Sequence, residues 1–206
     1  MSGVLQDPGV PLVLASTSAT RAALLRSAGL AFTTAAPGVD EESVKESARA
    51  DGLSASDAAL LLAELKARRI SERVPQAVVI GADQILVCGG RWFDKPRDRA
   101  AAAAQLAALS GRRHELVTAV LVMRGGVVLW RHVATPRLTM RPLTAATISA
   151  YLDAAGEAVL RSVGAYQAEG LGIRLFDAIE GEHAAILGLP LLPLLGFLRQ
   201  HRVLTD

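Results

Sequence analysis

The segment VLASTSATRAALL, residues 13–25, joins the two patterns that decide the fold. It begins in a short apolar run that is typical of a buried strand, and alanines and leucines at helical spacing follow at once. Ser18 suits the N-cap of a helix over residues 19–28, which Gly29 ends. Hydroxyls and N–H groups at a helix N-terminus bind anions, so the segment predicts a phosphate site with Arg21 in it. The alternative is a plain helix cap with Arg21 as a solvated surface charge.

The rest of the chain repeats the alternation of strand and helix. This order favours an α/β or mixed fold. We expect residues 1–10 to form a flexible tail and residues 11–206 to form one domain. Helices are predicted over residues 54–69, 98–109 and 144–155 and from Pro190 onward, β-rich segments over 77–83 and 85–88, and a long hairpin over 115–140.

Composition excludes several classes of protein. With 51% hydrophobic and 20% charged residues, the 206-residue chain is typical of soluble globular proteins. A net charge of +2 and eight aromatic residues disfavour a nucleic-acid-binding module. The longest uncharged tract, residues 184–198, is shorter than a bilayer span and contains two prolines. The early Asp7 and the lack of a basic leader disfavour a signal peptide, so we expect a cytoplasmic protein without membrane or nucleic-acid partners.

One carboxylate stands out in the segment VVIGADQ. Asp83 follows four apolar residues and a glycine, at the point where the strand is expected to leave the core. Ligands of α/β sheets collect at the carboxyl ends of strands, where an acid can hold Mg²⁺ or activate water. The alternative is an ordinary turn acid. Ile85 occupies the place of the second acid that an aspartate-nucleophile phosphatase would carry, so that mechanism is disfavoured.

Three further segments offer polar groups with two interpretations each. Lys95, fixed in an extended loop before Pro96, is either a triphosphate-binding cation or a solvated lysine. The acids at residues 40–42 are either a solvated acidic loop or the source of a second catalytic carboxylate. The Gly-rich segment GAYQAEGLG, residues 164–172, either lets the backbone approach a ligand or forms a plain turn. The four histidines and Cys88 show no zinc-ligand spacing.

The order and spacing of these segments carry more information than any one of them. The chain contains LASTSATR, GVDEE, LAELKA, GADQ, KPRD, LSGRRHE, RPLT, VGAYQAEGLG and IEGEHAAILGLPLLPL in sequence. Over residues 11–200 it resembles the Maf family of nucleoside triphosphate pyrophosphatases. The resemblance implies an α/β fold related to the inosine triphosphate pyrophosphatases, with a mixed sheet and two lobes around a nucleotide cleft. It also implies a homodimer that uses Mg²⁺, or Mn²⁺ as the alternative, to hydrolyse a nucleoside triphosphate to the monophosphate and pyrophosphate.

The resemblance also implies roles for individual residues. Asp83 matches the catalytic acid, described as the proton acceptor, and Asp83 with Glu41 is the implied metal-binding pair. The other implied positions are the charged active-site residues Glu41, Lys66 and Lys95 and the phosphate-binding residues Ser16, Ser18 and Arg21. Positive charges on the lysines and the arginine would offset the charge of the phosphates.

The base that the site accepts is implied by a second comparison within the family. The branch that cleaves dTTP and UTP typically carries a threonine where this chain has Gln84 and a glutamine where it has Glu169. The pair found here is similar to the branch of the 7-methyl-GTP pyrophosphatases. A carboxylate can accept hydrogen bonds from the N1–H and N2 groups of guanine. Thr20 departs from both branches, in which arginine or tryptophan is usual at that position.

A second class of function stays open beside the enzyme. The family's name, septum formation inhibition, suggests a non-catalytic nucleotide-binding regulator of cell division. Asp83, Glu41, Lys66 and Lys95 are all present, and a degenerate regulator is expected to have lost at least one of them. The sequence therefore favours the enzyme.

Overall fold

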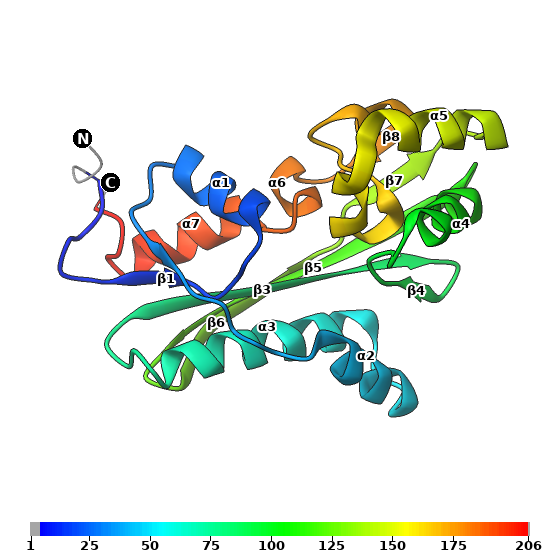
Figure 1. Cartoon of the computed structure of the whole chain (residues 1–206). Helices are drawn as coiled ribbons and strands as arrows, with labels where there is room; N and C mark the ends of the chain where they lie inside the picture. Colours follow the sequence, from blue (N-terminus) through cyan, green and yellow to red (C-terminus); the bar gives the residue numbers. More distant parts are fainter. Residues whose placement is uncertain (1–4, 206) are drawn as a thin grey trace. The chain divides into compact units, whose positions relative to one another are not determined.

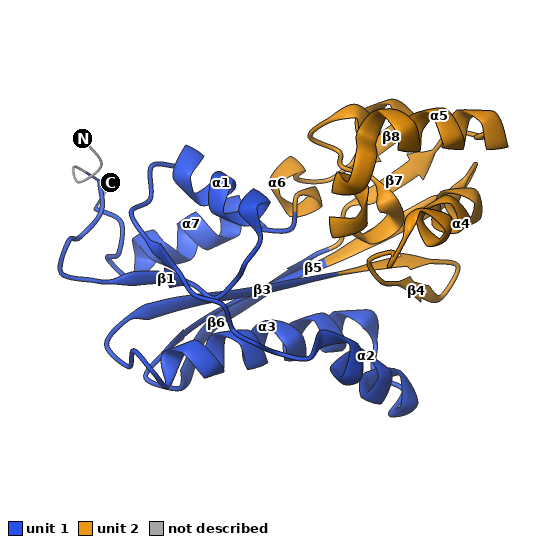
Figure 2. Cartoon of the chain, viewed as in Figure 1, with its two compact units in different colours: residues 1–84, 118–134, 188–206 blue, residues 85–117, 135–187 orange. Residues whose placement is uncertain are grey.

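Two long strands, β3 (Val78–Cys88) and β5 (Arg113–Arg124), organise the fold. The computed structural model describes residues 5–205, which divide into two compact units (Figures 1 and 2). Unit 1 comprises residues 1–84, 118–134 and 188–206, and unit 2 comprises residues 85–117 and 135–187. Each long strand therefore contributes one half to each unit.

Unit 1 is a mixed sheet between helices. Its strands follow the order β2-β1-β3-β5-β6, in which β2, β1 and β3 are parallel and β5 and β6 are antiparallel. Helices α1 and α7 lie on one side of these strands and α3 on the other (Figure 1). The remaining elements are β1 (Leu12–Leu14), β2 (Thr33–Thr34), β6 (Val127–Ala134), α1 (Ala19–Ser27), α2 (Glu41–Ala50), α3 (Ala55–Ser71) and α7 (Leu191–Gln200).

Unit 2 combines an antiparallel set of strands with three α-helices and three short 3₁₀ helices. Its strands follow the order β4-β3-β5-β7-β8, in which the β3–β4, β5–β7 and β7–β8 pairs are antiparallel. The predicted hairpin over 115–140 is longer than the observed one, because residues 137–140 form β7 and pair with the other half of β5. The remaining elements are β4 (Arg91–Phe93), β7 (Arg137–Met140), β8 (Phe176–Glu180), α4 (Arg99–Leu109), α5 (Ala145–Ala155), α6 (His183–Ile186), η1 (Gly156–Arg161), η2 (Val163–Ala165) and η3 (Leu171–Leu175).

The predicted alternation of strands and helices is confirmed as a mixed α/β fold, and the N-cap predicted at Ser18 is correct. Ser18, Thr144 and Asp98 each accept a hydrogen bond from the third residue of the helix that follows. Residues 1–4 of the predicted tail lie outside the described residues. Gln6 is buried, and its amide forms two hydrogen bonds of 2.9 Å with the backbone of Ala31, so this part of the predicted tail is held by unit 1. Within residues 5–205, no helix is long and apolar enough to cross a membrane.

Helix α3 packs closely on β3 because Gly81 has no side chain. A Cβ atom at Gly81 would clash with the carbonyl oxygen of Ala63 and would lie 2.9 Å from the Cβ of Ala67. Both alanines belong to α3 and are fully buried. Three small residues at this contact therefore let the helix backbone approach the strand, two residues before Asp83.

We predict that Gly81→Ala lowers the free energy of unfolding by about 1–3 kcal/mol, because the added methyl group overpacks this contact. Gly196→Ala is the matched control, since a Cβ at Gly196 in α7 meets nothing within 4 Å. In a helix this second change should leave stability unchanged or raise it by up to about 1 kcal/mol. Urea unfolding of both variants measures the difference, and equal stabilities would contradict a tight α3–β3 contact.

The core of unit 2 contains a buried histidine. His114 on β5 is 1% exposed, and its Nε2 lies 2.9 Å from the hydroxyl oxygen of Tyr166. The ring of Phe176 packs against both residues, with its centroid 5.9 Å from that of His114 and 4.8 Å from that of Tyr166. Desolvation by burial lowers the pKa of His114 from 6.5 to about 4. His114 is therefore neutral in the folded protein at pH 7.

This pKa predicts a loss of stability in weak acid. Between pH 6.5 and about 4 the unfolded chain binds a proton at His114 and the folded chain does not, so the free energy of unfolding falls as the pH falls. The contribution of this one group over the whole window is about 3 kcal/mol. Urea unfolding at several pH values should show a shallower pH dependence in His114→Gln than in the wild type. Equal slopes in the variant and the wild type would contradict the low pKa of His114.

Candidate active site

A buried lysine joins two carboxylates in unit 1. The side chain of Lys66 on α3 is 4% exposed, and its Nζ lies 2.5 Å from Oδ1 of Asp83 and 2.6 Å from Oε1 of Glu41. Asp83 is as deeply buried as Lys66, whereas the side chain of Glu41 is 37% exposed. Because buried charges are costly unless they are paired, this geometry holds α2, α3 and β3 together. The cluster is closed at Asp83 and reaches solvent at Glu41.

Asp83 lies next to the end of the neighbouring strand β1 and in the interior of its own strand, β3. The prediction that the strand leaves the core at Asp83 is wrong, because β3 continues to Cys88. The parallel neighbour β1 instead ends at Leu14, which pairs with Ile80, three residues before Asp83. Asp83 therefore lies beyond the carboxyl end of β1, which is the usual position of ligand sites in parallel sheets.

Glu41 is the first residue of a helix. The interpretation of residues 40–42 as a solvated loop is wrong, since α2 begins at Glu41 and Asp40 is its N-cap, accepting a hydrogen bond of 3.1 Å from the Ser43 N–H. Acidic residues in the first turn are favoured by the helix dipole. The sequence carried this signal, because an aspartate followed by two glutamates is a typical helix start.

Arg21 is anchored at the start of α1. Its Nε donates to the carbonyl oxygen of Gly188 at 2.7 Å, and its Nη1 donates to Oγ of Ser16 at 3.4 Å. Ser18 caps the helix, as predicted, by accepting a hydrogen bond of 3.3 Å from the Arg21 N–H. Burial lowers the pKa of Arg21, whereas the negative charges of Asp83 and Glu41 raise it. The alternative of a solvated surface arginine is therefore wrong, and Arg21 lies within electrostatic reach of both carboxylates.

Two residues of this site were not identified from the sequence. Gly188 adopts a φ of +97°, and a Cβ there would lie 3.3 Å from Nε of Arg21, so a larger residue would strain the backbone and crowd the guanidinium. Thr118 on β5 accepts a hydrogen bond of 2.8 Å from Nε2 of Gln84. Gly188 lies 167 residues from Arg21, and Thr118 lies 34 residues from Gln84, so no local sequence pattern could have paired them.

Of the ten predicted site residues, eight belong to unit 1 and two to unit 2. In unit 2, Lys95 is exposed in the loop between β4 and α4, as predicted. Glu169 is also exposed, between η2 and η3, and its charge adds to the burial that raises the pKa of Tyr151. The residues in unit 1 are Ser16, Ser18, Thr20, Arg21, Glu41, Lys66, Asp83 and Gln84.

The carboxylates of unit 1 fit a divalent cation that is shared with phosphate. Oδ2 of Asp83 is buried and has no hydrogen-bond partner in the described chain, which is the arrangement expected of an oxygen that awaits a ligand. Residues 5–205 contain no group of three or more His, Cys, Asp or Glu side chains that could form a closed metal site. Mg²⁺ is commonly bound by one or two carboxylates together with substrate phosphates and water. Asp83 and Glu41 match that pattern.

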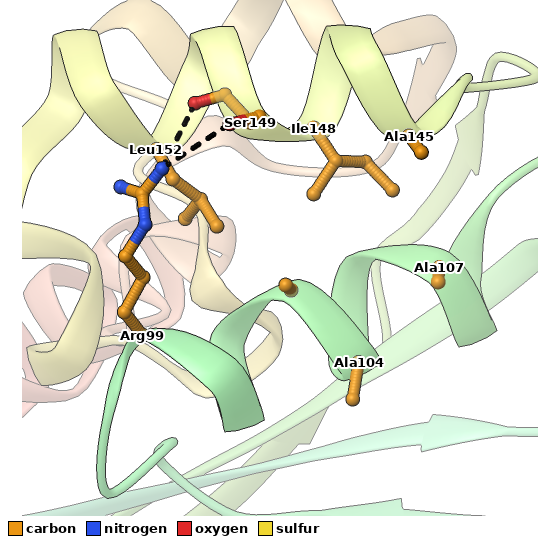
Figure 3. Close-up of a pocket in the computed structure, with 8 residues that line it drawn as sticks. Arg99, Ala104, Ala107, Ala145, Ile148, Ser149 and Leu152 are labelled. Atoms are coloured by element: carbon orange, nitrogen blue, oxygen red, sulfur yellow. Dashed lines mark hydrogen bonds between the residues drawn. The ribbon is translucent and has the colours of Figure 1, made fainter.

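A groove in unit 2 has no carboxylate in its lining that could bind a cation. It lies between α4 and α5, has a volume of about 360 Å³, and is lined mainly by small and apolar side chains (Figure 3). Its one charged lining residue, Arg99, bonds to Ser149 and forms an ion pair of 2.8 Å with Asp153. The lining residues are Arg99, Ala103, Ala104, Ala107, Ala145, Ile148, Ser149 and Leu152, and no predicted site residue is among them.

The sequence of the chain matches known proteins over nearly its whole length. Residues 11–201 match the family model described as Maf-like protein. The chain belongs to the Maf family. A nucleoside triphosphate pyrophosphatase of Granulibacter bethesdensis is 54% identical over 94% of this chain and 98% of that protein. Proteins with the same name are 54% identical in Rhodospirillum rubrum, over 95% of this chain and 97% of that protein, and 55% identical in Rhodopseudomonas palustris, over 95% and 96%.

A solved structure shows a weak likeness. The crystal structure of a nucleoside-triphosphatase, a dITP/XTP pyrophosphatase of Mycobacterium abscessus, is 18% identical, covers 94% of both chains and gives a TM-score of 0.42.

Proposed function

We propose that this Maf protein hydrolyses nucleoside triphosphates to the nucleoside monophosphate and pyrophosphate. The observation that carries the proposal is the cluster of Lys66, Asp83 and Glu41, with a buried, unpartnered oxygen of Asp83 and with Arg21 in electrostatic reach. The curated relatives that are more than half identical over nearly the whole chain carry the name of this activity. Both point to anhydride hydrolysis.

Each residue of the cluster has a role that its environment supports. Water attacks the α-phosphorus, the bond from this phosphorus to the α–β bridging oxygen breaks, and pyrophosphate leaves. Asp83, as a carboxylate, is the general base that accepts the proton of the attacking water, and this role requires it to lie close to the phosphate. Arg21 and Lys66 offset the negative charge that develops on the phosphate oxygens. The hydroxyls of Ser16 and Ser18 keep Arg21 and the N-terminus of α1 in place.

Asp83 and Glu41 are the residues that would hold Mg²⁺ or, alternatively, Mn²⁺. Such a cation, bound by the two carboxylates, supplies Lewis-acid stabilisation of the phosphate oxygens. Lys66 then has a second role, because its Nζ keeps both carboxylates in a fixed orientation when they bind neither metal nor substrate.

We further propose that a purine triphosphate, with 7-methyl-GTP as the leading candidate, is the preferred substrate. Gln84 and Glu169 support this proposal, since a carboxylate accepts hydrogen bonds from guanine and repels the O2 and O4 acceptors of uracil and thymine. The expected homodimer and cytoplasmic location stay predictions.

The role of Asp83 as the proton acceptor is tested by a conservative substitution. Asp83→Asn keeps the shape of the side chain, and its Oδ1 can still accept a hydrogen bond from Lys66, but it removes the proton acceptor, so kcat should fall by about 10²-fold or more. Asp51→Asn, at an exposed aspartate outside the cluster, is the matched control and should keep wild-type turnover. Ion chromatography of the products should show the monophosphate and pyrophosphate.

Two results would contradict the proposal. Release of inorganic phosphate and a nucleoside diphosphate would show cleavage at the other anhydride. A wild-type protein that binds nucleoside triphosphates but hydrolyses none of them with saturating Mg²⁺ would favour the non-catalytic regulator.

The base preference is tested by comparing kcat/KM for 7-methyl-GTP, GTP, dTTP and UTP. The wild type should prefer the purine nucleotides, and Glu169→Gln should weaken that preference, because the neutral amide no longer repels the pyrimidine acceptors. Glu157→Gln, at another exposed glutamate of unit 2, should keep the wild-type ratios. A wild-type preference for dTTP or UTP would refute the assignment of the base while leaving the hydrolysis itself untouched.

A further inference from the structure

Gln84, a predicted base-specificity residue, is held by a side chain to which no role has been assigned. Nε2 of Gln84 donates to Oγ1 of Thr118 at 2.8 Å. Thr118 is fully buried in β5, and Gln84 is half-buried in β3. A buried hydroxyl is retained where it has a partner, because valine has nearly the same shape and avoids the cost of burying a polar group.

The two residues lie on the face of the sheet opposite the acid cluster. Alternate residues of a strand point to opposite faces. Residues Ile80 and Ala82 of β3 and Val120 and Val122 of β5 all pack in one apolar cluster with side chains of α1 and α7. Gln84 is the next residue on the same face of β3, and Thr118 is the next on the same face of β5. Their hydrogen bond is consistent with both side chains lying on this face.

The side chain of Asp83 lies on the opposite face of the sheet. Its side chain reaches Lys66 on α3, and Gly81, two residues earlier, also contacts α3. Figure 1 shows α3 on one side of the strands and α1 on the other. The neighbours Asp83 and Gln84 therefore direct one group toward the catalytic cluster and the other toward the face that carries α1 and Arg21.

A glutamine side chain has three rotatable bonds, and a half-buried one loses selectivity if its amide can turn. The hydrogen bond from Nε2 to Thr118 restricts the rotation of this amide. A carbonyl oxygen accepts up to two hydrogen bonds, so the Oε1 end favours bases that present N–H groups. An amide that is ordered before the ligand arrives also loses less freedom on binding.

We propose that Thr118 is a positioning residue for base selection, which holds the amide of Gln84 so that its carbonyl end meets the nucleobase. This inference rests on the proposed function and adds a residue to it. It predicts that the hydroxyl of Thr118 acts on the choice of base through Gln84, and that it acts little on the phosphate chemistry of Asp83.

The test is a double-mutant cycle read out as base selectivity. Thr118→Val keeps the shape and removes the hydroxyl, Thr118→Ser keeps the hydroxyl, and Gln84→Ala removes the amide. For each variant and for Thr118→Val with Gln84→Ala, kcat and KM are measured with GTP, 7-methyl-GTP, dTTP and UTP. Thr118→Val should reduce the ratio of purine to pyrimidine kcat/KM by about 5–10-fold, the value of one hydrogen bond. The change should lie in KM more than in kcat, Thr118→Ser should restore the ratio, and the double variant should match Gln84→Ala.

The outcomes separate this inference from the function on which it rests. If Gln84→Ala alters the ratio and Thr118→Val does not, the positioning role is refuted and the base role of Gln84 stands. If Thr118→Ser loses selectivity as far as Thr118→Val does, packing and not the hydroxyl is responsible, and the inference is also refuted. If Gln84→Ala leaves the ratio unchanged, the base role of Gln84 fails and takes the inference with it. If the wild type hydrolyses no triphosphate, the proposed function itself fails.

Unfolding in urea shows whether each variant is folded before its kinetics are interpreted. If Thr118→Val does not fold, Thr118→Ala against Thr118→Ser gives the same comparison of a side chain without and with the hydroxyl. Selectivity that survives in Thr118→Ala would then overturn the inference, and selectivity that is lost there and kept in Thr118→Ser would support it.

Discussion

The ammonium group of Lys66 between Asp83 and Glu41 is the interaction on which the rest of the site depends. Two of the three charged groups are almost fully buried, and charges in such surroundings are strongly destabilising unless each finds a partner at short distance. Three elements must therefore be placed correctly at once. Helix α3 must approach β3 closely, which the small residues at Gly81 permit, and α2 must begin where its first residue reaches Lys66. The active-site geometry is in this sense a condition of folding, and not an addition to a finished scaffold.

The position of Asp83 beyond β1 follows from unequal strand lengths. β1 has three residues and β3 has eleven, so β3 continues past its last pair with β1, at Ile80, to Asp83. The chain that leaves β1 fills this position with the hydroxyls of Ser16 and Ser18 and with Arg21. A carbonyl from the other end of the chain, that of Gly188, then fixes the guanidinium. The short first strand and its polar continuation are thus one feature, because the hydroxyls lie where a longer strand would have continued the sheet.

Local features of the sequence were predictable and distant contacts were not. Ser18 was identified as a helix cap because capping involves residues only three positions apart. The helical start at Glu41 was missed although its signal was local, since a run of acids was taken for a solvated loop. The burial of Arg21 depends on Gly188, and the partner of Gln84 lies on another strand, so neither could be read from periodicity or spacing. The roles of Asp83 and Lys66 came from a family resemblance, and only the folded chain shows that the two side chains meet.

The alternation of a β-strand separates two tasks that adjacent residues perform. Asp83 contacts α3 through Lys66, whereas Gln84 contacts β5 through Thr118, although a single peptide bond joins them. The backbone of β3 is fixed by its pairing with β1 up to Ile80 and with β4 from Leu86. Under the proposed function, a substitution on the Gln84 side would therefore alter which base is accepted without moving the carboxylate. The same fold would then keep the chemistry of anhydride hydrolysis while the nucleotide that it selects changes.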